Sequence, residues 1–242
     1  MPKHVQLNSV EHKDIRVITK RDASLGDAIM AAPLFPQEFR EAQALYPIVF
    51  SKEQKTGKFR PYSLFGLEEG ENLFLDNDGW NGHYLPLAVR MQPFLIGFAG
   101  KPGPDTPMEV HIDIDHARVG TQEGEALFHD HGGETDFLKE IASLLGAIDD
   151  AEQTIPAFSA MLNEFELIEP FTLDITLDNG AQGRLAGYYT IAEERLQQLA
   201  ASELDRLQRA GMLQPIYMAV ASLSQFVSLI RKKNQQLARS RS

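Results

Sequence analysis

The residues best suited to chemistry lie in the segment Glu109-Val-His-Ile-Asp-Ile-Asp-His116. Apolar and ionisable side chains alternate along it, as they do in a strand whose successive side chains point to opposite faces. Glu109, His111, Asp113 and Asp115 would then share one face of the strand. Imidazole and carboxylate groups suit divalent first-row metals, and a His-x-Asp pair supplies two of the three ligands of a non-haem iron(II) site.

A third metal ligand could come from His129 or His131, which stand in a polar turn before an expected helix, or from His83. In this alternative interpretation His111, Asp113, His129 and His131 bind Fe(II) or Zn, and the protein is an oxygenase-like enzyme. The favoured interpretation is a half-buried strand whose isoleucines point inward and whose ionisable groups meet water. It predicts no cofactor.

A second candidate site consists of Tyr46, Trp80, Tyr84 and Arg90. They belong to the stretch 46–98, in which nearly every aromatic residue stands beside a proline or a glycine. Aromatic rings and a guanidinium could form a stacking platform for a sugar or a peptide. The alternative is core packing, with Arg90 paired to a carboxylate, because an arginine in an apolar stretch needs a partner.

Composition excludes several classes of function. The 242 residues contain no cysteine, which excludes disulfides, thiolate zinc sites and cysteine nucleophiles. The net charge of −11 argues against a nucleic-acid partner. The N-terminus shows no apolar leader, which predicts a cytoplasmic protein. The apolar run 216–230 has 15 residues, fewer than the roughly 20 that span a bilayer, so we expect a buried helix and no transmembrane segment.

The pattern of apolar residues predicts an α+β fold. A mostly antiparallel sheet from the first half pairs with a β-hairpin at about 171–190, and C-terminal helices cover it. We expect one domain over residues 1–232 and a basic, disordered tail over 233–242. Ser24 is the expected N-cap of a short helical turn. The expected strands are 46–51, 59–66, 72–75, 93–98 and 108–115, and the expected helices are 135–145, 151–165, 192–200, 202–210 and 214–233.

The sequence resembles the SapC family over roughly residues 10 to 232. The residues that carry the resemblance in the first half are Tyr46-Pro-Ile-Val-Phe50, Gly66, Asn72-Leu-Phe74, Trp80, Tyr84-Leu-Pro86, Arg90 and Pro93-Phe94. Those of the second half are Leu127-Phe128, Glu164, Leu167, Leu185, Gly187-Tyr188, Leu196, Leu199, Leu204, Leu207, Gly211-Met-Leu213, Ser222-Leu223 and Leu229-Ile230. The motifs are specific as a set, although each alone is uninformative.

The resemblance implies a bacterial protein linked to a surface layer. It implies partners among TonB-dependent receptor systems or halogenase-like flavoproteins, near which many members are encoded, and it provides no catalytic residues. We therefore expect a non-enzymatic accessory or binding protein of the envelope that recognises a peptide or a glycan. A metal-dependent enzyme is the alternative, and a partner subunit of a flavoprotein is a third hypothesis.

Overall fold

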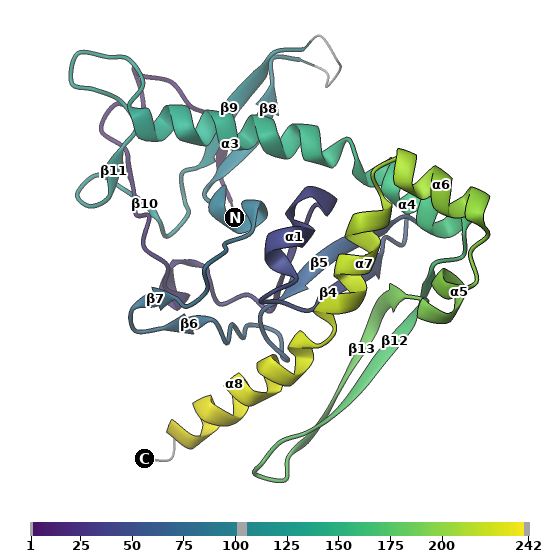
Figure 1. Ribbon diagram of the computed structural model, residues 1–242. Coiled ribbons are helices and arrows are strands. Elements are labelled where there is room, and N and C mark those ends of the chain that lie inside the picture. The colour runs from purple at the N-terminus through teal and green to yellow at the C-terminus, as the bar shows by residue number, and fades with distance from the viewer. Residues whose placement is uncertain (1, 101–105, 240–242) are drawn as a thin grey trace. The chain divides into compact units, whose positions relative to one another are not determined.

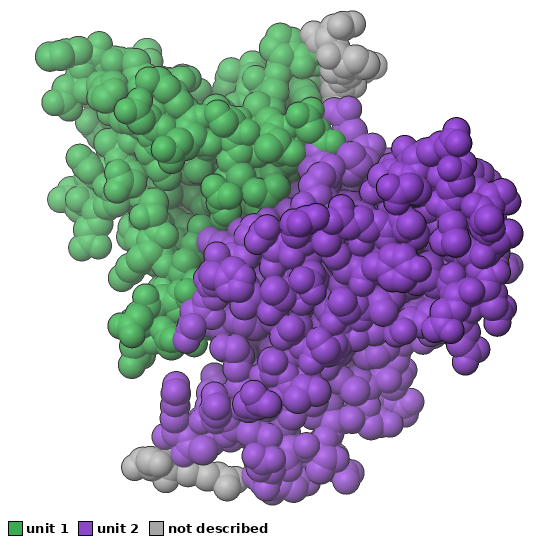
Figure 2. All heavy atoms as spheres, viewed as in Figure 1, with its two compact units in different colours: residues 1–28, 75–80, 87–150 green, residues 29–74, 81–86, 151–242 purple. Residues whose placement is uncertain are grey.

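The structure is a computed structural model that describes residues 2–100 and 106–239 (Figure 1). Contacts within the chain separate two compact units, which Figure 2 distinguishes by colour. The first unit comprises residues 1–28, 75–80 and 87–150, and the second comprises 29–74, 81–86 and 151–242. Each unit is therefore assembled from segments that lie far apart in the sequence. The single domain expected over 1–232 stays a prediction.

A three-stranded antiparallel sheet in the order β1-β9-β8 organises the first unit. Its strands are β1 (His4–Gln6), β8 (Phe94–Phe98) and β9 (Met108–Asp113). Ile112 of β9 stands opposite Phe94 of β8, and both are buried. The rings of Phe94 and Phe137 meet edge-on with centroids 6.2 Å apart, which packs α3 (Asp136–Glu152) against the sheet. The strands expected at 93–98 and 108–115 are confirmed in place, although β9 ends at Asp113.

Short elements complete the first unit. A second sheet has the order β10-β2-β11, and β6 pairs with β7 as a small hairpin. These elements are β2 (Arg16–Val17), η1 (Ala23–Leu25), β6 (Leu75–Asp76), β7 (Gly79–Trp80), α2 (Leu87–Arg90), β10 (Val119–Gly120) and β11 (Glu125–Ala126). They bring residues 16–27 beside residues 116–126, an arrangement on which the candidate site depends.

The second unit contains a five-stranded antiparallel sheet in the order β12-β13-β4-β5-β3. Its strands are β3 (Ala31–Pro33), β4 (Ile48–Lys52), β5 (Phe59–Leu64), β12 (Ile168–Thr176) and β13 (Gln182–Ile191). β12 and β13 form the long ribbon visible in Figure 1. Gly180, with φ 85°, lies in its turn. Tyr189 of β13 pairs with Phe50 of β4, so the expected hairpin joins the expected sheet. The α+β prediction is confirmed.

Helices cover the sheet of the second unit. They are η2 (Pro36–Glu38), α1 (Phe39–Ala42), α4 (Ile155–Glu164), α5 (Glu193–Gln197), α6 (Ala201–Arg209), α7 (Leu213–Ser222) and α8 (Gln225–Arg239). α7 packs on α1, β4 and β13, and its Ile216 and Ala219 are buried. Ser222 Oγ of α7 accepts a hydrogen bond from Ile48 N at 2.9 Å, which ties the helix to β4.

Two elements differ from the prediction because side chains compete with regular backbone hydrogen bonds. The helix expected over 214–233 is two helices that meet at residues 223–224, where Ser222 and Ser224 donate to carbonyls one turn earlier. The strand expected at 72–75 begins only at Leu75, because Asn72 Oδ1 accepts from Phe74 N at 3.0 Å. The disordered tail expected from residue 233 is also wrong up to Arg239, since α8 continues to that residue.

One stretch of the described chain, Leu213–Arg239, is long and apolar enough to cross a membrane by length and composition alone. It contains both α7 and α8, and 33% of its most apolar window is buried within the structure. Ile216 and Ala219 are buried and Ser222 bonds to β4, whereas Tyr217 and Val227 are exposed, so the stretch 216–230 that was expected to be buried is only partly so. The absence of a transmembrane segment stays a prediction.

Candidate functional site

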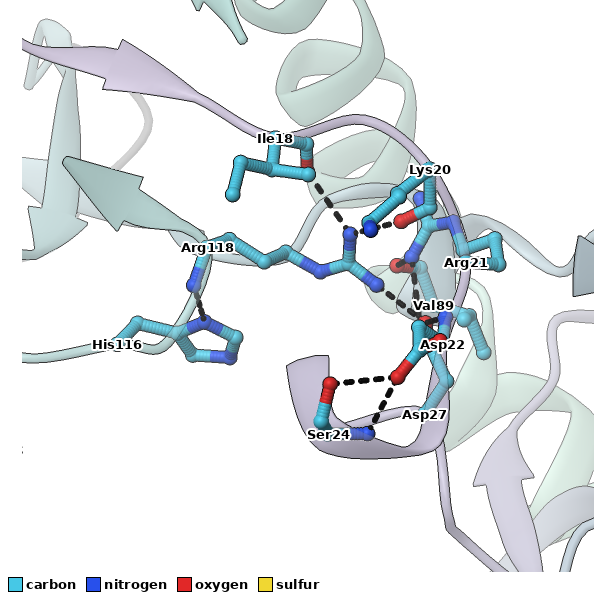
Figure 3. A network of polar contacts seen from close by, with 9 residues as sticks. All are labelled: Ile18, Lys20, Arg21, Asp22, Ser24, Asp27, Val89, His116 and Arg118. Carbon is cyan, nitrogen blue, oxygen red and sulfur yellow. Dashed lines mark hydrogen bonds and ion pairs between the residues drawn. The ribbon is translucent and has the colours of Figure 1, made fainter. Parts of the chain in front are cut away.

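Arg118, in the loop between β9 and β10, is the largest fully buried side chain of the described residues (Figure 3). Its Nη1 donates to the carbonyl oxygens of Ile18 at 2.9 Å and Lys20 at 2.6 Å. Its Nη2 forms an ion pair with the carboxylate of Asp27. Nε is buried without a hydrogen-bond partner in the described part of the chain. Arg118 therefore holds residues 18–27 against its own loop.

Asp27 is the counter-charge of this network, and its side chain is fully buried. Oδ2 also accepts from the backbone N–H of Asp22 at 2.8 Å, and Oδ1 accepts from Arg21 Nη1 at 3.2 Å. The local sequence places it there. Asp22 caps η1 by accepting hydrogen bonds from the hydroxyl and the backbone N–H of Ser24. These two hydrogen bonds lower the pKa of Asp22. Ser24 is thus a donor and not the predicted N-cap.

Arg21 connects the buried pair to the surface of the first unit. Its side chain is 14% exposed, and Nη1 donates to the carbonyl oxygen of Val89 at 3.0 Å as well as to Asp27. Burial lowers the pKa of Arg21, and the charge of Arg118 lowers it further. The charge of Arg90, which is exposed at the end of α2, contributes to the same effect. We call Arg21, Arg90 and Arg118 the arginine cluster.

The backbone of the segment that carries Trp80 also approaches the backbone of Arg21. A Cβ atom added to Gly79, its neighbour in β7, would be 3.5 Å from the carbonyl oxygen of Arg21. The segments that carry Trp80 and Arg90 therefore both approach Arg21 within one unit. Trp80 is half-buried. Two of the four residues predicted for ligand binding thus follow directly after residues that approach Arg21, an arginine that the sequence did not single out.

The arginine cluster carries more positive charge than its buried partner neutralises. Two guanidinium groups, those of Arg21 and Arg118, bond to one buried carboxylate, Asp27. Burial lowers the pKa of Arg21, and the positive charges of Arg118 and Arg90 lower it further. An added anion would relieve this repulsion. Guanidinium groups bind carboxylates and phosphates through two parallel hydrogen bonds, which makes arginine well suited to such a ligand. The arrangement can therefore bind an anion and orient it.

His116 stays largely uncharged beside the cluster. Its Nδ1 accepts from Arg118 N at 3.2 Å, and burial followed by the charge of Arg118 lowers its pKa. A protonated imidazole could not accept this bond. The pKa of His116 is lower in the folded state than in the unfolded state, so folding favours the neutral imidazole. Its contribution to the free energy of unfolding is complete above pH 6.5 and declines as the pH falls toward the folded pKa.

The other two predicted platform residues lie in the second unit. Tyr46 is fully buried between Phe65 and Phe74, with centroids 5.1 and 4.7 Å away, and its hydroxyl donates to the carbonyl oxygen of Tyr84. The Tyr84 hydroxyl donates to Glu38 Oε1 at 2.6 Å. These contacts are those of a core, and they leave no open face of the Tyr46 ring. A platform shared by all four residues stays a prediction.

The candidate metal ligands are engaged separately. Asp113 Oδ1 accepts from the backbone N–H groups of Lys3 at 2.8 Å and Asp115 at 3.2 Å. The His111 imidazole lies over Gly97, where a Cβ would be 2.1 Å from Cδ2. Its Nε2 is buried without a hydrogen-bond partner in the described residues and is 3.6 Å from Glu109 Oε2.

His129 and His131 are both exposed in a turn before α3. The described residues contain no group of three or more histidine, cysteine, aspartate or glutamate side chains that could hold a metal ion. The metal site, like the expected absence of a cofactor, stays a prediction.

The fold is that of an α+β protein, and in its first unit two guanidinium groups share one buried carboxylate. The chain matches the SapC family over residues 7–229 and belongs to it. No curated protein and no solved structure matches the chain.

Proposed function

We propose that this protein is a non-enzymatic binding protein that assists the bacterial envelope, and that its first unit binds a carboxylate-bearing peptide or glycan at the arginine cluster. The observation that supports this proposal is that two guanidinium groups, those of Arg21 and Arg118, share one buried carboxylate, Asp27, while the charge of the exposed Arg90 also acts on Arg21. Membership of the SapC family supports the link to a surface layer and to partners in TonB-type uptake systems or halogenase-like flavoproteins.

The exposure of each arginine assigns its role in binding. Arg118 is enclosed and its Nη atoms are bonded to the chain, so it positions Asp27 and does not meet a ligand. Arg21 is partly exposed and Arg90 is exposed, so these two guanidinium groups contact the anion. Trp80 is half-buried and follows Gly79, whose backbone approaches that of Arg21, and its ring provides an aromatic surface for the apolar part of a sugar ring or side chain.

Local charge gives the site its selectivity. A chain with net charge −11 repels anions at long range, so the guanidinium groups must supply the local attraction for an anionic ligand. Neutral ligands gain nothing from the cluster. Binding to it should therefore weaken as salt is added, since exposed charges are screened over about 8–10 Å at physiological ionic strength.

Calorimetric titration tests the proposal. We expect trigalacturonate or a tri-aspartate peptide to bind the intact protein, and galactotriose or tri-asparagine to bind at least tenfold more weakly. Arg90→Ala removes charge-assisted hydrogen bonds worth about 1.5–3 kcal/mol, which corresponds to roughly a tenfold to hundredfold loss of affinity. Arg231→Ala, at an exposed arginine of α8, is the matched control and should bind like the wild type. Equal affinity for charged and neutral ligands, or no effect of Arg90→Ala, would refute the proposal.

A further inference from the structure

A separate hollow of about 280 Å³ lies in the second unit, between the β4–β5 hairpin and the junction of α3 with α4. Ser51 and Arg60 pair across β4 and β5, and Tyr62 follows Arg60 on the same face of β5. Glu152 comes from the end of α3, and Ile155 begins α4. The walls therefore come from segments about 100 residues apart that the fold of this unit brings together.

A bidentate ion pair fixes one wall of the hollow. Arg60 Nη1 and Nη2 bond to the two carboxylate oxygens of Glu152 at 2.7 and 2.8 Å. The hydrogen bond to Glu152 raises the pKa of Arg60, so the guanidinium stays charged. The two side chains remain 34% and 39% exposed. A guanidinium has five donors and a carboxylate about four acceptor sites, so both groups keep capacity for a ligand.

The charges that line this hollow cancel. Lys58 and Arg60 are positive, while Glu53 and Glu152 are negative. A site with balanced charge gives no advantage to an anion or a cation. It does offer donors and acceptors together, and a hydroxyl group can accept from one and donate to the other. This chemistry differs from that of the arginine cluster.

Apolar groups complete the lining. The half-buried Tyr62, the buried Ile155 and the exposed Pro156 provide hydrocarbon surface beside the ion pair. Small-molecule sites combine apolar walls with a few placed polar groups and usually measure 300–1,000 Å³. At about 280 Å³ the hollow is below this range, which limits the ligand to roughly one small ring.

We propose that this hollow is a binding site for a neutral monosaccharide unit. A pyranose combines an apolar C–H face, which Tyr62 and Ile155 match, with a rim of hydroxyl groups, which the paired Arg60 and Glu152 can both donate to and accept from. The proposal is independent of anion binding by the first unit, because the two sites share no residue.

The chain offers a matched control for the ion pair. Arg206 and Glu164 form a second bidentate pair in the same unit, with bonds of 2.7 and 3.0 Å, and neither residue lines the hollow. Glu152→Gln and Glu164→Gln thus make the same chemical change in the same kind of pair. Lys58→Met tests the site at an exposed position of the hairpin turn if Glu152→Gln fails to fold.

Saturation-transfer NMR on the intact protein, with glucose, galactose, mannose and N-acetylglucosamine, provides the test. We expect at least one of these sugars to bind with millimolar affinity. Glu152→Gln or Lys58→Met should lower the affinity for that sugar at least tenfold, and Glu164→Gln should change this affinity less than twofold. The proposal is overturned if none of the four sugars binds, or if Glu164→Gln weakens binding equally. Glucuronate or free serine that binds more tightly than every neutral sugar would overturn it as well.

Discussion

The buried pair of Arg118 and Asp27 allows a quantitative prediction for Asp27→Asn. The substitution keeps the size of the side chain but removes the one buried carboxylate that faces two guanidinium groups. An asparagine has one oxygen in place of two, so it cannot accept from Arg21, Arg118 and the Asp22 N–H in the present geometry. Loss of one partner from a buried ion pair costs about 3–5 kcal/mol.

That loss is a large part of the roughly 5–15 kcal/mol that stabilises a folded domain. For a chain of this length each 1 kcal/mol moves the Tm by about 2–4 °C, so we expect a decrease of roughly 6–20 °C. Urea unfolding followed by circular dichroism measures the free energy of unfolding. Amide hydrogen exchange should show that protection is lost first in residues 16–27 and 116–126, which the network joins.

Two variants complete the experiment. Asp205→Asn breaks an exposed i,i+4 pair with Arg209, so it should change stability by less than about 1 kcal/mol. The double substitution Asp27→Asn with Arg118→Met removes one of the two uncompensated guanidinium groups, so it should be more stable than Asp27→Asn alone. The reasoning is refuted if Asp27→Asn costs no more than Asp205→Asn, or if Arg118→Met adds its own full cost in the double variant.

Three further predictions concern histidines of the first unit. Lowering the pH from 7 to 5 should destabilise the wild type more than the His116→Asn variant, because the lowered pKa of His116 opposes protonation in the folded state. Parallel pH profiles of the unfolding free energy for the two proteins would contradict this. Gly97→Ala should lower the free energy of unfolding by about 1–3 kcal/mol, because the added methyl group overpacks against the His111 ring. In a double-mutant cycle His111→Ala should restore part of that stability, and additive losses from the two substitutions would exclude the contact. Protein purified without a tag should contain no stoichiometric iron or zinc by elemental analysis; metal that disappears in His111→Ala would establish the metal-enzyme hypothesis instead.

Strong local patterns were sufficient to predict much of the fold. Apolar alternation on both sides of Asp178-Asn-Gly180 predicted the hairpin that β12 and β13 form. The strands at 93–98 and 108–113 and the helices of the C-terminal half were predicted in the same way, from periods of two and 3.6 residues. The set of aromatic, proline and glycine motifs was sufficient to identify the SapC family.

The element boundaries that were predicted wrongly have causes that the periodicity of apolar residues does not reveal. Asn72 Oδ1 accepts from the backbone N–H of Phe74 and delays a strand, and two serines separate α7 from α8. The helix beyond residue 233 depends on contacts elsewhere in the chain. Lys233 Nζ donates to Glu71 Oε1 at 2.5 Å, although the two residues are 162 positions apart in the sequence. The basic composition of the tail gives no indication of this distant partner.

The sequence by itself determined the class of fold, the family and the presence of Trp80 and Arg90 in one candidate site. Only the tertiary structure decided what surrounds them. Arg118 and Asp27 are 91 residues apart and neither belongs to a motif, so no local pattern could pair them. Hydrophobic periodicity reports which face of an element is buried, whereas an ion pair in the interior depends on which distant segments that burial brings into contact.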